Sequence, residues 1–249
     1  MEVILVRQLI YGLNLSSQVV SKLREEGITL KLENQGSFVL YQREGGFPVS
    51  SVRKVVTTTR CREEDFLAYP VHSTQPEIST NLLLRLSRPI IVAPHSTISI
   101  YVKVPISVGI YLFNEETQML IDSFSRHTYK YALYGSTASG MICRFHRTDV
   151  YLQVPEKELW NAITKVIIEN DSEDYCEVKN IVFPVLNTMT YVDEQGAAYI
   201  ETIRLHISRG GLGFTSLENA PPLDGLKEGP RQFGKSQERV VKFLLEFGF

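Results

Sequence analysis

The chain has 249 residues, of which 43% are hydrophobic and 22% charged, with a net charge of −2. This is enough for a buried core, in one large β domain or two smaller ones, without disulfide bonds. Three cysteines that lack a Cys-x-x-Cys spacing exclude a disulfide framework and a zinc motif. No apolar run reaches the ~18 residues of a membrane span, and the apolar start lacks signal-peptide features. We therefore expect a cytoplasmic protein.

The N-terminal part is predicted to hold one short helix followed by strands. Residues 16–27 place apolar residues at helical spacing, after a serine that can cap the start and before Gly27, which can end the helix. Residues 28–41 alternate in polarity around an Asn-Gln-Gly turn at 34–36 and predict a β-hairpin. The β-branched residues of 49–59 predict another strand.

Alternation with a period of two is clearest over residues 98–112, where one face is apolar throughout. The pattern predicts a half-buried strand pair or one long bent strand. Because Pro105 cannot donate to a strand ladder, it marks an edge, a bulge or a crossing between sheets. Residues 82–86 and 89–94 predict strands just upstream, with a turn at 94–97.

Short strands continue through the second half of the chain. They are predicted at 129–134, 141–155, 163–169, 176–186 and 191–207, the last of these interrupted by a turn at 193–196. A connector rich in Gly and Pro follows at 210–234, and Ser236 opens a predicted terminal helix with apolar residues at helical spacing.

We therefore predict a mostly-β fold with two immunoglobulin-like β-sandwich units. The first unit is predicted at residues 1–126 and the second at 127–216, followed by a linker and a short C-terminal helix within 217–249. Each sheet is expected to bury one side and expose the other, and to leave no cavity in which chemistry could be organised.

Several segments share a strand pattern, namely Tyr129-x-Tyr-x-Leu-Tyr-Gly135, Gly140-x-Ile-Cys-Arg144, Asp149-Val-Tyr151, Tyr101 to Tyr111 and the ending Phe243-Leu-Leu-Glu-Phe-Gly-Phe249. In these segments the chain resembles a family of archaeal proteins of unknown function. The resemblance implies an archaeal, cytoplasmic protein, and it implies no activity, ligand or catalytic residue.

Two motifs suggest chemistry that their context does not support. Gly229 to Ser236 matches the phosphate-loop pattern, but no hydrophobic strand leads into it and too little chain follows to supply a magnesium-binding acid. We interpret it as a loop that caps a helix, where a weak anion contact could still form. Cys143, His146 and Asp149 suggest a catalytic triad, but positions 143 and 146 of a strand point to opposite faces.

A basic and aromatic segment is the best candidate binding site. No acidic residue lies between Asp122 and Asp149, whereas cations, histidines and aromatics alternate there. If Cys143 and Phe145 face the core, Arg144 and His146 face outward. The candidate residues for binding nucleic acid or a partner are Lys130, Tyr131, Tyr134, Arg144, His146 and Arg147.

Such a surface can stack bases and track phosphates. Alternatively, the tyrosines pack between domains and the arginines solvate a face or bridge to residues 149–201, whose net charge is −8. The overall pI of about 6.2 favours this alternative.

The leading functional hypothesis is a non-enzymatic binding or assembly protein that acts through protein–protein surfaces, with a protein partner or a second copy of the chain. The alternative is nucleic-acid binding through residues 126–147. The third is an enzyme whose site gathers scattered residues such as His127, His146 and Asp149. No catalytic residue, cofactor or metal site is predicted.

Overall fold

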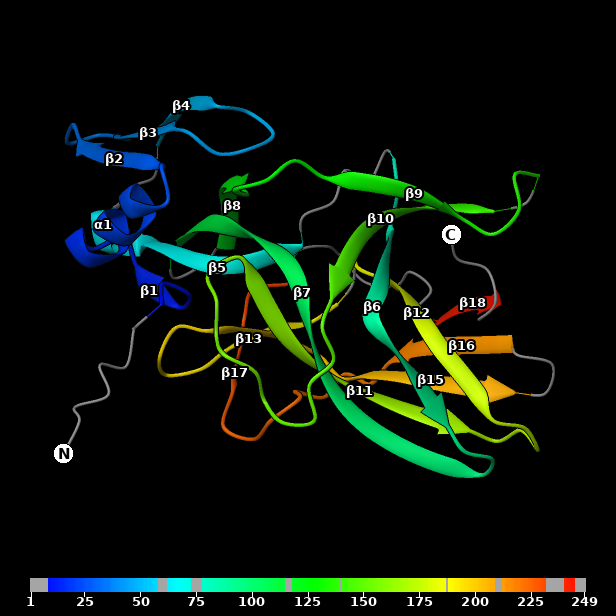
Figure 1. Ribbon diagram of the computed structural model, residues 1–249. Helices are drawn as coiled ribbons and strands as arrows, with labels where there is room; N and C mark the ends of the chain where they lie inside the picture. Colours follow the sequence, from blue (N-terminus) through cyan, green and yellow to red (C-terminus); the bar gives the residue numbers. More distant parts are fainter. Residues whose placement is uncertain are drawn as a thin grey trace.

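The computed structural model describes residues 9–57, 62–72, 78–114, 118–138, 140–186, 188–208, 212–231 and 240–244. These residues are mostly β, as predicted (Figure 1). The helical elements are α1 (Ser17–Glu25) and the 3-10 turn η1 (Glu63–Asp65). The strands are β1 (Leu13–Asn14), β2 (Thr29–Asn34), β3 (Val39–Glu44), β4 (Ser51–Val56), β5 (Phe66–His72), β6 (Asn81–Val92), β7 (Ser96–Phe113), β8 (Gln118–Phe124), β9 (Lys130–Tyr134), β10 (Met141–Thr148), β11 (Asn161–Asn170), β12 (Cys176–Pro184), β13 (Thr190–Val192), β14 (Ala198–Ile200), β15 (Ile203–Ser208), β16 (Leu212–Leu217), β17 (Lys227–Glu228) and β18 (Val240–Leu244).

Strand β7 joins the two ends of the largest sheet. Its first half, up to Pro105, pairs antiparallel with β11, and its second half, from Ile106, pairs with β5. Strand β8 pairs with the other edge of that second half. The alternating pattern therefore belongs to one long strand, and Pro105 lies where the strand changes partners, as expected for a residue that lacks an N–H donor.

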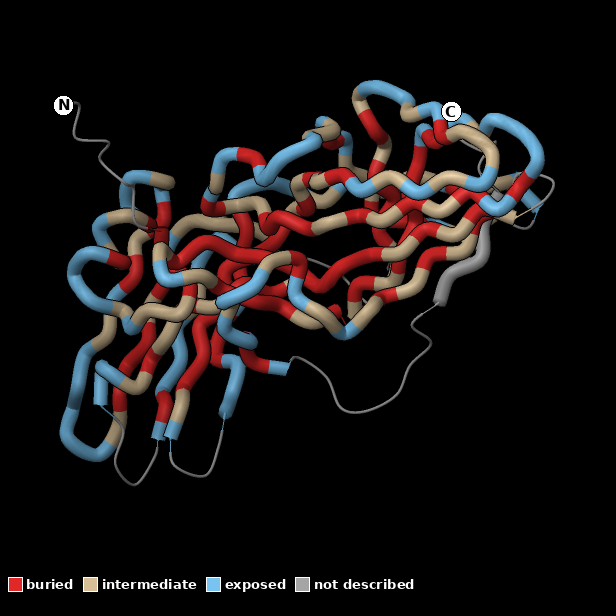
Figure 2. Tube along the Cα trace, turned by 90° about the horizontal axis from the view of Figure 1, so that it is seen from below, coloured by how far each residue is buried: buried red, intermediate tan, exposed pale blue. Residues whose placement is uncertain are grey.

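A second sheet, in the order β12-β6-β10-β9, packs on the part of the large sheet that contains β11, β15 and β16. Buried polar side chains form hydrogen bonds between the two layers. The Thr215 hydroxyl of β16 donates to the carbonyl of Val182 in β12, and the Asn170 amide of β11 donates to the carbonyl of Val92 in β6 at 3.1 Å. Buried residues run along the central strands of both layers, while the exposed residues gather in loops and at strand ends (Figure 2).

The N-terminal residues form a helix and a small sheet of their own. Helix α1 begins after Ser16 and ends before Gly27, whose φ is +81°, as predicted from the sequence. The predicted hairpin is formed by β2 and β3, and β4 completes a three-stranded sheet. In that sheet Arg43 of β3 is buried and forms an ion pair of 2.6 Å with Asp122 of β8.

The two predicted immunoglobulin-like units are not confirmed. Strands from both sides of residue 126 share both larger sheets, because β7 pairs with β11 and β6 pairs with β10 and β12. Patterns of alternation identify strands but not their partners, since partners far apart in the chain leave no local trace.

The predicted terminal helix is wrong where the structure describes it. Residues Val240–Leu244 form β18, which pairs antiparallel with β16. A short apolar run fits helix and strand equally well, and the open edge of β16 provides backbone partners that favour the strand. No helix within the described residues is long and apolar enough to cross a membrane.

Candidate ligand-binding cleft

A cleft of about 1580 Å³ opens between α1, the start of β9 and the connection that joins β10 to β11. The strand β7 contributes Pro105 and Ile106 to its floor, and β10 contributes residues 144–147. The expectation that the sheets leave no cavity is therefore wrong. The cleft exists because β7 changes partners here and the chain leaves the sheets on both sides of that point, through residues 125–128 and 154–160.

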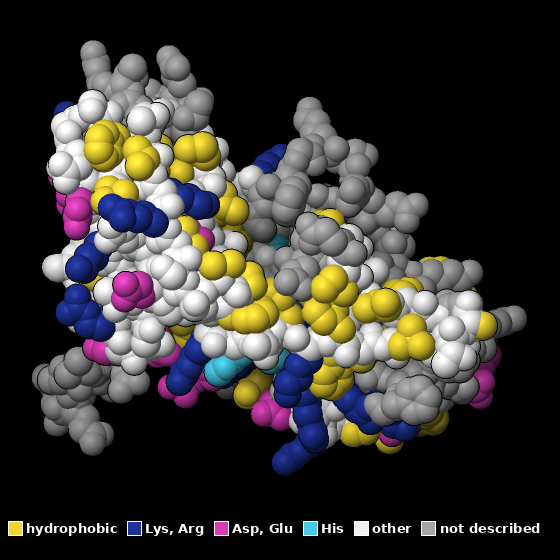
Figure 3. Space-filling view, turned by 90° about the horizontal axis from the view of Figure 1, so that it is seen from above, with side chains coloured by type: hydrophobic (Ala, Val, Ile, Leu, Met, Phe, Trp, Pro, Cys, Tyr) yellow, Lys and Arg dark blue, Asp and Glu magenta, His cyan; other side chains and the backbone are white. Residues whose placement is uncertain are grey.

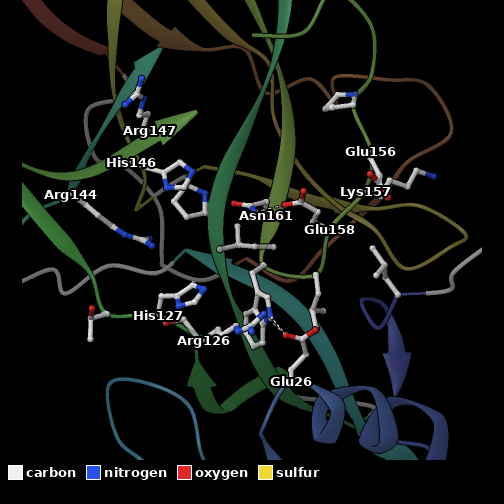
Figure 4. Close-up of a pocket in the computed structure, with 18 of the residues that line it drawn as sticks. Glu26, Arg126, His127, Arg144, His146, Arg147, Glu156, Lys157, Glu158 and Asn161 are labelled. Atoms are coloured by element: carbon white, nitrogen blue, oxygen red, sulfur yellow. Dashed lines mark hydrogen bonds and ion pairs between the residues drawn. The ribbon is translucent and has the colours of Figure 1, made fainter. Parts of the chain in front are cut away.

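The charged side chains that line the cleft are mainly basic. The cations are Lys22, Arg126, Lys130, Arg144, Arg147 and Lys157, and the carboxylates are Glu26, Glu156 and Glu158. Figure 4 shows Arg144, His146 and Arg147 on one wall and Asn161, Glu158 and Glu156 on the opposite wall. The cleft is thus lined by basic and imidazole groups on one side, and by carboxylates, an amide and the ammonium group of Lys157 on the other.

Two of the three carboxylates already have partners. Glu26 accepts hydrogen bonds from Arg126 at 2.9 Å and from the indole N–H of Trp160 at 3.0 Å. Glu158 pairs with Lys103 and accepts a hydrogen bond of 2.7 Å from Asn161. Burial by itself raises the pKa of Glu158, but the hydrogen bonds from Lys103 and Asn161 outweigh burial and lower the pKa overall.

Lys130 and Arg147 are exposed at the cleft, and within the described residues neither forms an ion pair. The pairing of β9 with β10 fixes their positions, since Lys130 lies opposite Phe145, two residues before Arg147. These two cations are available to a negatively charged group that enters from solvent.

Arg144 is buried rather than outward-facing, which corrects the expectation from the sequence. Its guanidinium lies 4.5 Å from the centre of the Tyr129 ring. Strand β7 of the other sheet covers this side of β10, where the Lys103 N–H of β7 donates to the Thr148 hydroxyl of β10 at 3.1 Å. Burial lowers the pKa of Arg144 to about 10, although the nearby Tyr129 and Tyr131 oppose the shift.

His146 is half-buried beside Arg144. Burial, followed by the positive charge of Arg144, lowers the pKa of His146 to about 4, while Glu158 has the opposite effect. The imidazole is therefore neutral at neutral pH and can donate one hydrogen bond and accept another.

The structure brings four of the six predicted binding residues together at the cleft, namely Lys130, Arg144, His146 and Arg147. The two tyrosines are placed differently. Tyr131 lies opposite Arg144 in the β9–β10 ladder and is half-buried, and Tyr134 is only 4% exposed. A base cannot stack on the Tyr134 ring, because the fold covers it almost completely.

A protein-family model matches residues 10–246, and its description is "Protein of unknown function (DUF432)". The chain belongs to this family. No curated protein and no solved structure matches the chain. The resemblance to a family of unknown function is thereby confirmed.

The cleft also contains residues that the sequence did not single out. Glu26 and Trp160 lie 134 residues apart in the chain, and they meet only through the fold. The one local signal was that Trp160 is the single tryptophan of the chain, which by itself indicates no site. Glu156 and Glu158 belong to the acidic segment, where they resemble any other surface carboxylates.

Of the rejected triad, His146 lines the cleft, whereas Cys143 and Asp149 do not. Burial raises the pKa of the Cys143 thiol to about 12, and Asp149 accepts a hydrogen bond from Ser87. Most of the string from Gly229 to Ser236 lies outside the described residues. Within the parts of the chain that the structure describes, no group of three or more His, Cys, Asp or Glu side chains could hold a metal ion.

Proposed function

We propose that this protein is a binding protein whose ligand carries an oxyanion, such as a phosphate or carboxylate group, that enters the cleft. The observation that supports the proposal is the charge imbalance described above. Lys130 and Arg147 have no ion-pair partner within the described residues, whereas Glu26 and Glu158 are already engaged.

A basic cleft has physical consequences for an anion. Its low-dielectric walls focus the field of the cations and raise the local concentration of negatively charged molecules. Arginine presents a planar fork of N–H donors that matches phosphate and carboxylate oxygens. The neutral His146 and the Asn161 amide add hydrogen-bonding groups that orient a ligand without adding charge.

A compact ligand fits these observations better than a nucleic-acid strand does. Single-strand binders combine a basic groove with exposed aromatic rings on which bases stack. Here Tyr134 is buried, and the Tyr129 ring already contacts the Arg144 guanidinium and forms a T-shaped pair with the Phe47 ring. The basic groups that recognise phosphates are thus accessible, but two of the rings that would recognise bases are not.

Assembly through protein surfaces has a different supporting observation. Leu133 and Ile142 lie opposite each other in the β9–β10 ladder and are 40% and 53% exposed. Figure 3 shows hydrophobic side chains gathered in a band on this face, with Lys, Arg and His side chains along one margin. Assembly stays a prediction, because an exposed apolar pair by itself does not identify what covers it.

Calorimetric titration with inorganic pyrophosphate at low salt tests the proposal. We expect the double variant Lys130→Glu/Arg147→Glu to bind at least about tenfold more weakly than the wild type, since it loses two attractive charges and gains two repulsive ones. The matched control is Lys31→Glu/Arg88→Glu, which changes the net charge equally at two exposed residues that do not line the cleft.

The control variant is expected to bind pyrophosphate as the wild type does. Equal binding, or an equal lack of binding, by the wild type and the cleft variant would contradict the proposal. A parallel titration with a ten-nucleotide oligothymidine distinguishes the two ligand classes. Much tighter binding of the oligonucleotide than of pyrophosphate would favour the nucleic-acid alternative.

A further inference from the structure

A single carboxylate oxygen of Glu26 is held by two donors inside the cleft. Arg126 donates to Oε2 from 2.9 Å (Figure 4). The Trp160 indole N–H donates to the same oxygen from 3.0 Å. The three residues come from three separate segments, which are the end of α1, the connection between β8 and β9, and the connection between β10 and β11.

The geometry of these donors is suited to an anion. A guanidinium and an indole N–H that converge on one oxygen at about 3 Å supply charge together with directed hydrogen bonds. Neither donor can accept a hydrogen bond, so both require an acceptor such as an oxyanion. The Glu26 oxygen therefore lies where an oxygen of an anionic ligand would lie.

The Glu26 carboxylate contributes little to the stability of the fold at this position. Helix α1 is anchored by Val19 and Leu23, which are 1% and 0% exposed. The side chains of Arg126 and Glu26 are 52% and 22% exposed, and ion pairs at such exposure stabilise a fold by only about 0–1 kcal/mol. An interaction of this strength can be exchanged for a ligand without unfolding the helix.

We infer that Arg126 and Trp160 form an anion subsite of the cleft, and that the Glu26 carboxylate occupies this subsite as an internal competitor until an anionic ligand displaces it. The inference rests on the proposed function, because it assumes that an oxyanion binds in the cleft. It adds to that proposal a specific subsite, and it explains why the affinity for an anionic ligand depends on Glu26, which carries the same sign of charge as the ligand.

Fluorescence provides a direct readout, because Trp160 is the only tryptophan in the chain. We propose to titrate wild type and Glu26→Gln with pyrophosphate while recording the tryptophan emission. The variant keeps the size of the side chain and removes its charge. We expect it to bind pyrophosphate roughly fivefold more tightly, the factor that corresponds to losing a competing ion pair of this exposure.

Glu33→Gln is the matched control. Glu33 is an exposed residue of β2 that does not line the cleft. Its substitution changes the net charge by the same amount and is expected to leave the affinity unchanged. In the background Arg126→Gln, the Glu26→Gln substitution is expected to give no gain, because the subsite has lost its cation.

The outcomes separate the two proposals. If Glu26→Gln binds pyrophosphate no more tightly than the wild type while Lys130→Glu/Arg147→Glu still weakens binding, the internal-competitor inference is overturned and the proposed function stands. If neither the wild type nor Glu26→Gln binds, the proposed function fails. If Glu26→Gln does not fold, the Trp160 emission of the wild type still tests the inference, because displacement of Glu26 must change that emission. Saturation of the wild type with pyrophosphate without any change in Trp160 emission would overturn the inference.

Discussion

The protein contains two groups of charged residues that differ in how they are satisfied. The first, the buried charge cluster, consists of Tyr41, Arg43 and Asp122, and it joins the small N-terminal sheet to β8. Asp122 accepts hydrogen bonds from Arg43 at 2.6 Å and from the Tyr41 hydroxyl at 2.7 Å, and Arg43 also donates to the carbonyls of Gly45 and Val49. The second group, in the cleft, is accessible to solvent and includes the cations Lys130 and Arg147.

The comparison shows how to distinguish a structural charge from a functional one. A buried ion must find partners within the protein, because an unpaired one has a large desolvation cost. A cation at a cleft has no such need, since water solvates it until a ligand arrives. We therefore expect substitutions in the buried charge cluster to alter stability, and substitutions of the cleft cations to alter binding.

The largest effect is expected from Asp122→Ala. It leaves the buried Arg43 without its carboxylate partner, and breaking one half of a buried pair costs about 3–5 kcal/mol. Urea denaturation measures the free energy of unfolding directly. A loss below about 1 kcal/mol would mean that the cluster does not hold the small sheet to β8. Any folded fraction of this variant is expected to bind pyrophosphate normally.

An intermediate effect is expected from acidification. Burial lowers the pKa of both His72 and His146 to about 4, and the charge of Arg144 contributes in each case. The unfolded chain, with histidine pKa near 6.5, takes up protons before the folded protein does, so the free energy of unfolding falls as pH decreases from about 7 toward 4. Between pH 7.5 and 5 each histidine contributes a loss of about 2 kcal/mol.

Replacing each histidine with glutamine is the check on this prediction. Urea denaturation at pH 7.5 and at pH 5 gives the change in stability for the wild type and for each variant. We expect His72→Gln and His146→Gln each to reduce the difference between the two pH values. A difference as large in both variants as in the wild type would show that these imidazoles do not control the acid response.

The smallest effect on stability is expected from Lys130→Glu/Arg147→Glu. Both residues are exposed and have no ion pair within the described residues, so the free energy of unfolding is expected to change by no more than about 0.5 kcal/mol for each substitution. The same variant is expected to lose pyrophosphate binding. If the double variant lost as much free energy of unfolding as it lost free energy of pyrophosphate binding, the distinction between the two groups of charged residues would be wrong.

Local features of the fold could be predicted from the sequence. The helix that ends before Gly27 and the hairpin that turns at residues 34–36 depend on neighbouring residues, and both are confirmed. One of the two alternatives predicted around Pro105, a single long strand, is confirmed, and Pro105 lies where this strand changes partners within the large sheet. Strand partners could not be predicted, and the segment at 240–244 became a strand because β16 lies beside it.

The candidate site could be predicted only in part, for a similar reason. Lys130 and Arg147 lie in a segment without acidic residues, so the sequence itself draws attention to them. The burial of Arg144 was missed because it depends on β7 and Tyr129, which cover that side of β10. The contact of Glu26 with Trp160 joins segments that are remote in the chain, and no spacing in the sequence encodes it.

Hydrogen–deuterium exchange with and without pyrophosphate tests the central claim, that the cleft is the ligand-binding site, most directly. We predict slower exchange in peptides that cover residues 125–130, 144–147 and 154–161, which line the cleft, and unchanged exchange in β2–β4. Slower exchange confined to segments away from the cleft, with no change in those three, would contradict the claim.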